Sequence, residues 1–198
     1  MKPQGDLTAL VGSRICHDLI SPLGAIGNGV ELLELSGIAH TPEMALIAES
    51  VAAAQARIRF FRVAYGAGEP TAPPLGRAEI ASILGAVARG GRLSYFWEAE
   101  GDVARREAKA IFLLLQCMET AMPVGGDIRI RRIATGWEIV AEGDRMVVDE
   151  ALWTGMLGRI RPTVTAAQVQ FALLPQTLTA MGKVLALKLA LGRIIARF

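Results

Sequence analysis

The chain of 198 residues is long enough for one ordinary domain, or for a small domain joined to a helical appendage. Hydrophobic residues make up 52% of it and the net charge is only +2, which argues against a disordered chain and against a nucleic-acid-binding protein. Two cysteines give no disulfide framework, and no apolar run approaches the roughly 20 residues of a membrane span, so we expect a cytoplasmic protein without a membrane partner.

Residues 6 to about 36 are predicted to form one long helix. Asp6 can cap its N-terminus, and Gly37 suits the left-handed turn that would end it. Apolar residues recur in steps of three and four, which places them on one face of a helix at about 100° per residue. This predicted stripe consists of Ile15, Leu19, Leu23, Ile26, Val30 and Leu33.

A second helix is predicted to begin at Thr41, a suitable cap, with Pro42 at the tolerated first position and Tyr65 near its end. Its apolar residues also alternate in steps of three and four, which is typical of a helical-bundle seam. They are Met44, Ile47, Val51, Ala54, Ile58, Phe61 and Tyr65. Two helices joined by a short turn form an antiparallel hairpin, and one hairpin leaves much of its apolar surface wet. We therefore expect a homodimer in which two hairpins form a four-helix bundle.

The pattern becomes mixed after a glycine- and proline-rich stretch at 66–74. Helices are predicted at 77–90, 104–122, 149–158 and 165–180, and strands at 92–98, 127–134, 137–142, 183–190 and 192–198. In the first strand hairpin, Ile128 and Ile130 alternate with Arg129 and Arg131, as expected for a sheet with one buried face. These elements predict an α/β sandwich with one sheet and its helices on one face.

The predicted fold class is therefore α+β. It divides into a dimerisation hairpin at 1–67, a linker at 68–76 and an α/β domain at 77–198.

The segment 13–23 on the first helix is the most informative part of the sequence. His17 lies opposite the apolar stripe, and Ser21, Gly24 and Asn28 lie within roughly 40° of it on a helical projection. This face is polar or small over three turns, so we expect it to be exposed. A single histidine on such a face is usually an ordinary surface residue, and its neighbours must decide whether it does more.

Three neighbours favour a functional histidine. Asp18 follows His17 directly, and its carboxylate can hold the ring proton so that one ring nitrogen remains nucleophilic. Ser21 stands one turn further on, where a hydroxyl can bond a phosphoryl oxygen or a water. Pro22 in mid-helix removes an N–H and crowds the carbonyl of Asp18, a distortion that bundle stability does not require.

Residues 17–23 read His-Asp-Leu-Ile-Ser-Pro-Leu and resemble the phosphoacceptor motif of sensor histidine kinases. Residues 24–32 read Gly-Ala-Ile-Gly-Asn-Gly-Val-Glu-Leu and are more specifically similar to the ChpT-type histidine phosphotransferases of alphaproteobacteria, as are segments 123–127 and 149–153. The resemblance implies that His17 is phosphorylated, that Asp18 is its acid/base neighbour and that Ser21 assists. It also implies a dimer built through the hairpins.

A sensor kinase carries a Bergerat-type ATPase domain after its hairpin, and the order of elements here fits that fold. The nucleotide site of such a domain needs an asparagine for Mg²⁺, an Asp-x-Gly-x-Gly loop and a glycine-rich lid. Asn28, on the hairpin, is the only asparagine of the chain, and the corresponding segments 114–121, 142–146 and 168–174 lack these groups. We therefore expect a degenerate ATPase-like domain, because nothing neutralises the nucleotide phosphates.

These features predict a phosphorelay histidine phosphotransferase that shuttles a phosphoryl group through His17 between receiver-domain aspartates. It would need no cofactor or metal of its own, because the receiver brings Mg²⁺. By resemblance, the partners are the receiver of a CckA-like hybrid kinase and CtrA-like or CpdR-like response regulators, docking over Gly24 and Asn28. Gly27 and Gly29 fit either a partner's close approach or helix–helix contact. The alternatives are a non-catalytic dimeric receiver-binding scaffold, and an ATP-dependent kinase with an atypical site.

Other candidates carry less weight. Cys16 and His17 make a poor metal pair, because adjacent residues of a helix diverge. His40, in the turn between the helices, is expected to be solvated. Three arginines of the second helix are interpreted as a solvated face rather than a receiver contact: Arg57, Arg59 and Arg62. The three tryptophans are expected in the core of the second domain: Trp97, Trp137 and Trp153.

Overall fold

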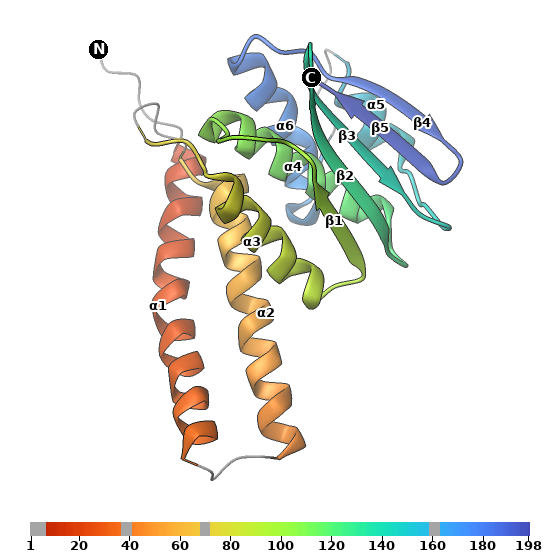
Figure 1. The fold of residues 1–198 in the computed structure, drawn as a ribbon. Helices are drawn as coiled ribbons and strands as arrows, with labels where there is room; N and C mark the ends of the chain where they lie inside the picture. Colours follow the sequence, from red (N-terminus) through yellow and green to blue (C-terminus); the bar gives the residue numbers. More distant parts are fainter. Residues whose placement is uncertain (1–6, 37–40, 68–71, 159–162) are drawn as a thin grey trace.

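The structure is a computed structural model that describes residues 7–36, 41–67, 72–158 and 163–198. Within these residues the fold is α+β, with six α-helices, one short 3-10 helix and a five-stranded sheet, which confirms the predicted class. Figure 1 shows the first two helices as a hairpin and the remaining elements as a more rounded unit beside one end of it. None of the helices in the described ranges is both long and apolar enough to cross a membrane.

The hairpin consists of α1 (Leu7–Leu35) and α2 (Pro42–Tyr65). The predicted start of α2 is confirmed: the Oγ1 of Thr41 accepts a hydrogen bond from the N–H of Met44 at 3.3 Å, and Pro42 stands at the first position. The predictions for Asp6, Gly37 and His40 fall outside the described residues.

The contact between α1 and α2 uses only part of the predicted apolar stripe. Val30 is buried and Leu23 half-buried against α2, where the Nε2 of Gln55 donates to the carbonyl of Leu23 at 3.0 Å. Gly12 lets α1 approach the last turn of α2, since a Cβ there would lie 3.0 Å from the carbonyl oxygen of Tyr65. The other four stripe residues stay between 42% and 53% exposed: Ile15, Leu19, Ile26 and Leu33. The apolar surface of α1 therefore consists of two adjacent stripes. One of them, which includes Leu23 and Val30, packs against α2, and the other remains exposed.

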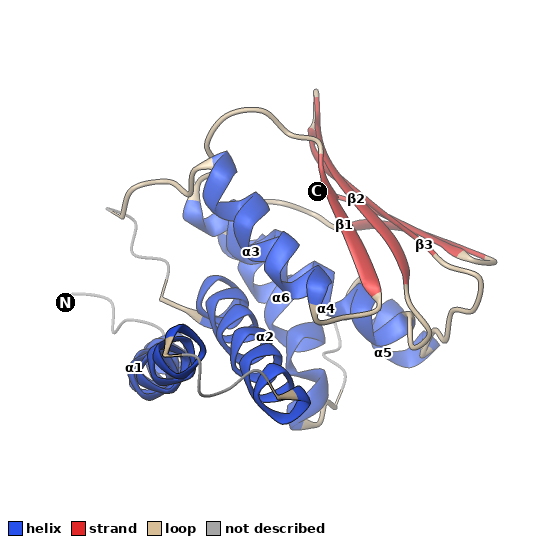
Figure 2. Cartoon of the chain, turned by 60° about the horizontal axis from the view of Figure 1, so that its bottom comes forward, coloured by secondary structure: helices blue, strands red, loops and turns tan. Residues whose placement is uncertain are grey.

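The opposite side of α2 carries a second buried face that the sequence pattern did not reveal. Ala56, Phe60 and Ala64 are almost fully buried against α3 (Arg77–Arg89) and α4 (Arg105–Ala121). The ring of Phe60 packs 4.7 Å from that of Phe112. Figure 2 shows the resulting order of layers, with α1 outermost, then α2, then the remaining helices and finally the sheet.

The sheet has the strand order β1-β2-β3-β5-β4, with β1 parallel to β2 and the other pairs antiparallel. The strands are β1 (Leu93–Trp97), β2 (Gly126–Ile133), β3 (Gly136–Glu142), β4 (Ala186–Ala190) and β5 (Arg193–Arg197). Two further helices, α5 (Glu150–Gly155) and α6 (Val169–Ala180), complete the helical layer. Figures 1 and 2 show these helices on one face of the sheet, as predicted.

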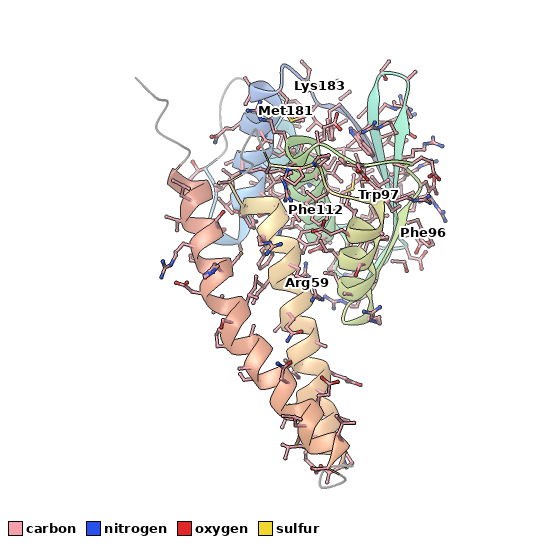
Figure 3. All side chains as sticks on the ribbon, turned by 60° about the vertical axis from the view of Figure 1, so that its left-hand side comes forward. Arg59, Phe96, Trp97, Phe112, Met181 and Lys183 are labelled. Atoms are coloured by element: carbon pink, nitrogen blue, oxygen red, sulfur yellow. The ribbon has the colours of Figure 1, made fainter. Side chains whose placement is uncertain are left out.

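The two faces of the sheet differ in the way the alternation in β2 predicted. Ile128 and Ile130 are fully buried beneath the helices, whereas Arg129 and Arg131 point outward. Of the tryptophans, Trp137 and Trp153 are core residues, as expected, while Trp97 is only half-buried. Figure 3 shows Trp97 and Phe112 among the dense side chains of this unit, beyond which the far half of the hairpin projects.

Candidate functional site

His17 lies on the exposed side of α1, where the helical projection placed it. Its side chain is 85% exposed, whereas Cys16, one residue earlier on α1, is buried inside the hairpin. Because neighbouring helical residues differ by about 100°, the two side chains mark the boundary between the covered and the open face of α1. The imidazole is therefore open to a partner molecule.

Asp18 contacts His17 directly. Its Oδ1 lies 3.3 Å from the Nδ1 of His17, and its Oδ2 accepts a hydrogen bond of 2.7 Å from the Nε of Arg14. Hydrogen bonding from Arg14, and then from His17, lowers the pKa of the Asp18 carboxyl below its ordinary value, so the group is ionised at neutral pH. An ionised carboxylate at Nδ1 favours the tautomer protonated there, which leaves the lone pair on Nε2. The Nε2 atom makes no hydrogen bond to any residue that the structure describes.

The remaining predicted site residues follow on the same helix. Ser21 and Asn28 are exposed, and Gly24 is half-exposed with open space where a Cβ would be. Pro22 lies inside α1 and leaves the carbonyl of Asp18 without its helical donor. The structure thus brings His17 and Asp18 into contact, and places the others along one open strip of helix without bonds between them.

Gly27 and Gly29, for which two roles were open, separate in the structure. A Cβ on Gly27 would lie 2.9 Å from the Nε2 of Gln55 on α2, so this glycine serves close helix–helix contact. A Cβ on Gly29 would meet nothing within 4 Å. Space for a partner to approach the backbone therefore exists at Gly29, as it does at Gly24, and does not exist at Gly27.

No cluster of three potential metal ligands occurs among the described residues. Burial raises the pKa of the Cys16 thiol, which keeps it protonated and makes it a poor metal ligand beside His17. The other cysteine, Cys117, is buried in α4 and its pKa is raised by the same cause.

Arg57 was interpreted as part of a solvated face, and that interpretation is wrong. Its Nη1 donates to both carboxylate oxygens of Glu119 on α4, at 3.0 and 2.9 Å. The hydroxyl of Tyr95 on β1 donates to the same carboxylate. Arg59 and Arg62, by contrast, are exposed as expected. Arg57 therefore joins the hairpin to the α/β unit.

A hollow of about 400 Å³ lies between α2, α4 and the start of α6. From α2 it is lined by Arg57, Phe61 and Tyr65, whose hydroxyl donates to the side-chain oxygen of Gln116. From α4 and α6 it is lined by Gln116, Glu119, Thr120 and Gln170. On this side, the 116–120 segment of α4 faces side chains of the hairpin.

Residues 77–190 match the family described as "Histidine phosphotransferase C-terminal domain", a region that covers more than half of the chain. The chain therefore belongs to the histidine phosphotransferase family.

One curated relative is the protein phosphotransferase ChpT of Brucella abortus (strain 2308), with 38% identity over 127 residues. That match covers 64% of this chain and spans 60% of the length of the Brucella protein. A solved structure described as a bacterial phosphotransferase shares the fold, with a TM-score of 0.69 and 24% identity across 99% of this chain and 97% of its own. Within its family the chain is of the ChpT type.

Proposed function

We propose that the chain is a phosphorelay intermediate that carries a phosphoryl group on His17 between receiver-domain aspartates. The observation that carries this proposal is the exposed imidazole of His17 with the ionised Asp18 carboxylate at its Nδ1. Membership of the histidine phosphotransferase family and the likeness to ChpT support a phosphotransfer role. Both cysteines are free, which fits a reducing, cytoplasmic location.

The reaction needs little from this chain beyond a positioned nucleophile. The Nε2 lone pair of His17 attacks the phosphorus of an aspartyl phosphate, the P–N bond forms and the P–O bond to the receiver carboxylate breaks. The ring becomes cationic with its proton on Nδ1, where Asp18 stabilises the charge. Transfer to a second receiver reverses these steps. Mg²⁺ belongs to the receiver, whose own site neutralises the phosphoryl oxygens.

We further propose that the α/β unit is a degenerate ATPase-like domain that binds no ATP. Three features support this: the unit contains no asparagine, its α4 segment faces Phe61 and Tyr65, and the carboxylate of Glu119 borders the hollow there. Arg57, the one arginine that lines this hollow, is already paired with the Glu119 carboxylate, so the hollow gives little electrostatic support to a triphosphate. Calorimetry with Mg·ATP should show no binding, and a micromolar affinity would instead favour the ATP-dependent kinase.

The uncovered stripe on α1 supports a homodimer in which two hairpins form a four-helix bundle. Ile15, Leu19, Ile26 and Leu33 are exposed along one side of α1, and Ile47 is exposed on α2. A second copy that packs against these residues removes them from water, at about 25 cal/mol per Å² of apolar surface. The proposed division of the chain is accordingly a dimerisation and phosphotransfer hairpin (1–67), a linker (68–76) and the ATPase-like unit (77–198).

The proposed partners are the receiver of a CckA-like hybrid kinase as donor and CtrA-like or CpdR-like receivers as acceptors. The open strip from His17 through Gly24 to Asn28 is the proposed docking face. The competing function is a dimeric scaffold that binds receivers without accepting phosphate. The two functions separate in a three-protein assay without ATP: a relay moves phosphate from one receiver to the other only when this chain is added. A scaffold binds both receivers and moves none.

A further inference from the structure

We propose that Arg14 is a positioning residue for phosphotransfer, acting through Asp18 to hold the His17 ring in its reactive tautomer; this inference rests on the proposed role of His17. Arg14 was not among the residues that the sequence motif indicated. The structure indicates this role because Arg14 bonds the carboxylate of Asp18, and the same carboxylate contacts His17.

The geometry uses each oxygen of the carboxylate once. The Nε of Arg14 bonds Oδ2 at 2.7 Å, and the other oxygen, Oδ1, lies 3.3 Å from the Nδ1 of His17. A hydrogen bond to one oxygen restricts rotation of the carboxylate group, which directs the second oxygen toward the Nδ1 of His17. A carboxylate held only by the 3.3 Å contact would exchange it readily for water. The three side chains therefore form a series in which the arginine fixes the acid and the acid fixes the imidazole.

A contribution to folding does not account for this pair. The side chains of Arg14 and Asp18 are 78% and 49% exposed, and exposed ion pairs one helical turn apart contribute only a few tenths of a kcal/mol. Replacement of Arg14 should therefore leave the hairpin folded. Any effect should appear at the imidazole, because the hydrogen bond made by one ring nitrogen determines which nitrogen carries the proton.

A direct contact of Arg14 with the phosphoryl group or the receiver is the alternative that a test must distinguish from action through Asp18. Its Nη groups make no hydrogen bond to the described residues, so the guanidinium could instead touch the phosphoryl group or the receiver directly. An arginine that acts through Asp18 loses its effect when Asp18 is removed. An arginine that touches phosphate or receiver keeps its effect. A double-mutant cycle distinguishes these two cases.

The experiment compares the wild-type chain, Arg14→Met, Asp18→Ala, the double variant and Arg106→Met, which removes an exposed charge on α4. The first readout is the ¹⁵N chemical shifts of the two ring nitrogens of His17 at neutral pH, assigned with His17→Gln. The second is the single-turnover rate of phosphate uptake from a phosphorylated receiver.

We expect Arg14→Met to move ring protonation from Nδ1 toward Nε2 and to slow uptake about tenfold, less than the loss of an acid/base group itself. In the Asp18→Ala background it should change neither readout, and Arg106→Met should change neither in the wild-type background. Unaltered ring shifts in Arg14→Met, or an equal loss of rate with and without Asp18, would overturn the proposal. If the wild-type chain takes up no phosphate, the proposed function fails. The ring shifts then still show whether Arg14, through Asp18, determines the tautomer of His17.

Discussion

Arg57 of α2 and Glu119 of α4, 62 residues apart in the chain, form an ion pair in which one arginine nitrogen reaches both carboxylate oxygens. The side chain of Glu119 is only 19% exposed, and its carboxylate also accepts a hydrogen bond from the hydroxyl of Tyr95. This contact and the packing of the Phe60 ring against the tilted ring of Phe112 hold the hairpin against the α/β unit.

Replacement of Arg57 by alanine should therefore destabilise the whole chain. It leaves a partly shielded carboxylate without its cation, at a cost of about 1–2 kcal/mol after allowance for the exposed arginine. Urea unfolding should show a lower midpoint with an unchanged slope. Arg59→Ala, an exposed arginine two residues on, is the matched control and should stay within about 0.5 kcal/mol of the wild type. Equal midpoints for the two variants would show that the pair contributes nothing.

The uncovered stripe of α1 predicts the effect of a charge at Ile26. Ile26→Glu should dissociate the dimer or unfold the protein, because a charge without a partner is expensive to bury. Asn28→Glu adds the same charge on the His17 face of the helix and should leave the dimer intact. Light scattering at micromolar concentration measures both. A wild-type chain that is folded and monomeric at that concentration would refute the dimer itself.

The outer face of the sheet predicts a dependence of stability on pH. Glu138 is 3% exposed and lies between Arg131 and Arg197, each of which donates from Nε at 2.6 Å. Burial alone would raise the pKa of this carboxyl, but the bonds from Arg197 and Arg131 outweigh it and lower the pKa. A lowered pKa in the folded state means that the stabilisation is complete above the unfolded-state value of about 4.3. It is lost as the pH falls through the folded-state value.

We therefore expect Glu138→Gln to reduce stability at pH 7 and to flatten the decline of stability below about pH 4.3. Urea midpoints at pH 7 and pH 3.5 measure this difference. Glu49→Gln, an exposed carboxyl on α2, should retain the wild-type profile. A Glu138→Gln variant whose stability falls as steeply as that of the wild type in acid would contradict the assignment.

The residues around the imidazole should rank by their contact with it. Asp18→Asn, which removes the charge at Nδ1, should slow phosphate uptake by about 10²–10⁴-fold, the usual effect of a positioned acid/base group. Ser21→Ala removes one neutral hydroxyl one turn away and should cost less, about 0.5–1.5 kcal/mol in barrier height. Single-turnover rates give both numbers, and a larger loss for Ser21→Ala would reverse the proposed roles.

Local patterns predicted the elements of this fold closely. The start of α2 at Thr41 and Pro42 follows from capping chemistry, and the alternation at 128–131 assigns the two faces of β2. The exposure of His17 follows from helical angles alone. Each of these depends on residues within a few positions of one another, which is why the sequence suffices for them.

The features that the sequence did not predict depend on tertiary contact. Phe60 is fully buried because α4 packs on the side of α2 away from α1. The ion pair between Arg57 and Glu119 forms across the same interface. No local spacing encodes either contact. The link from Arg14 to Asp18 is different, since an arginine four residues before an aspartate is a recognised helical pairing. That signal is present in the local sequence, unlike the two tertiary contacts.

The identity of the phosphorylated residue is the most direct test of phosphotransfer through His17. The wild-type chain, His17→Ala and His17→Gln are each incubated with a phosphorylated receiver in the absence of ATP, and the label on this chain is mapped. We expect acid-labile, base-stable phosphate on His17 of the wild-type chain and none on either variant. The dimer should be preserved, because His17 lies on the opposite side of α1 from the exposed apolar stripe. Uptake by His17→Ala, with the label on His40, would contradict phosphotransfer through His17.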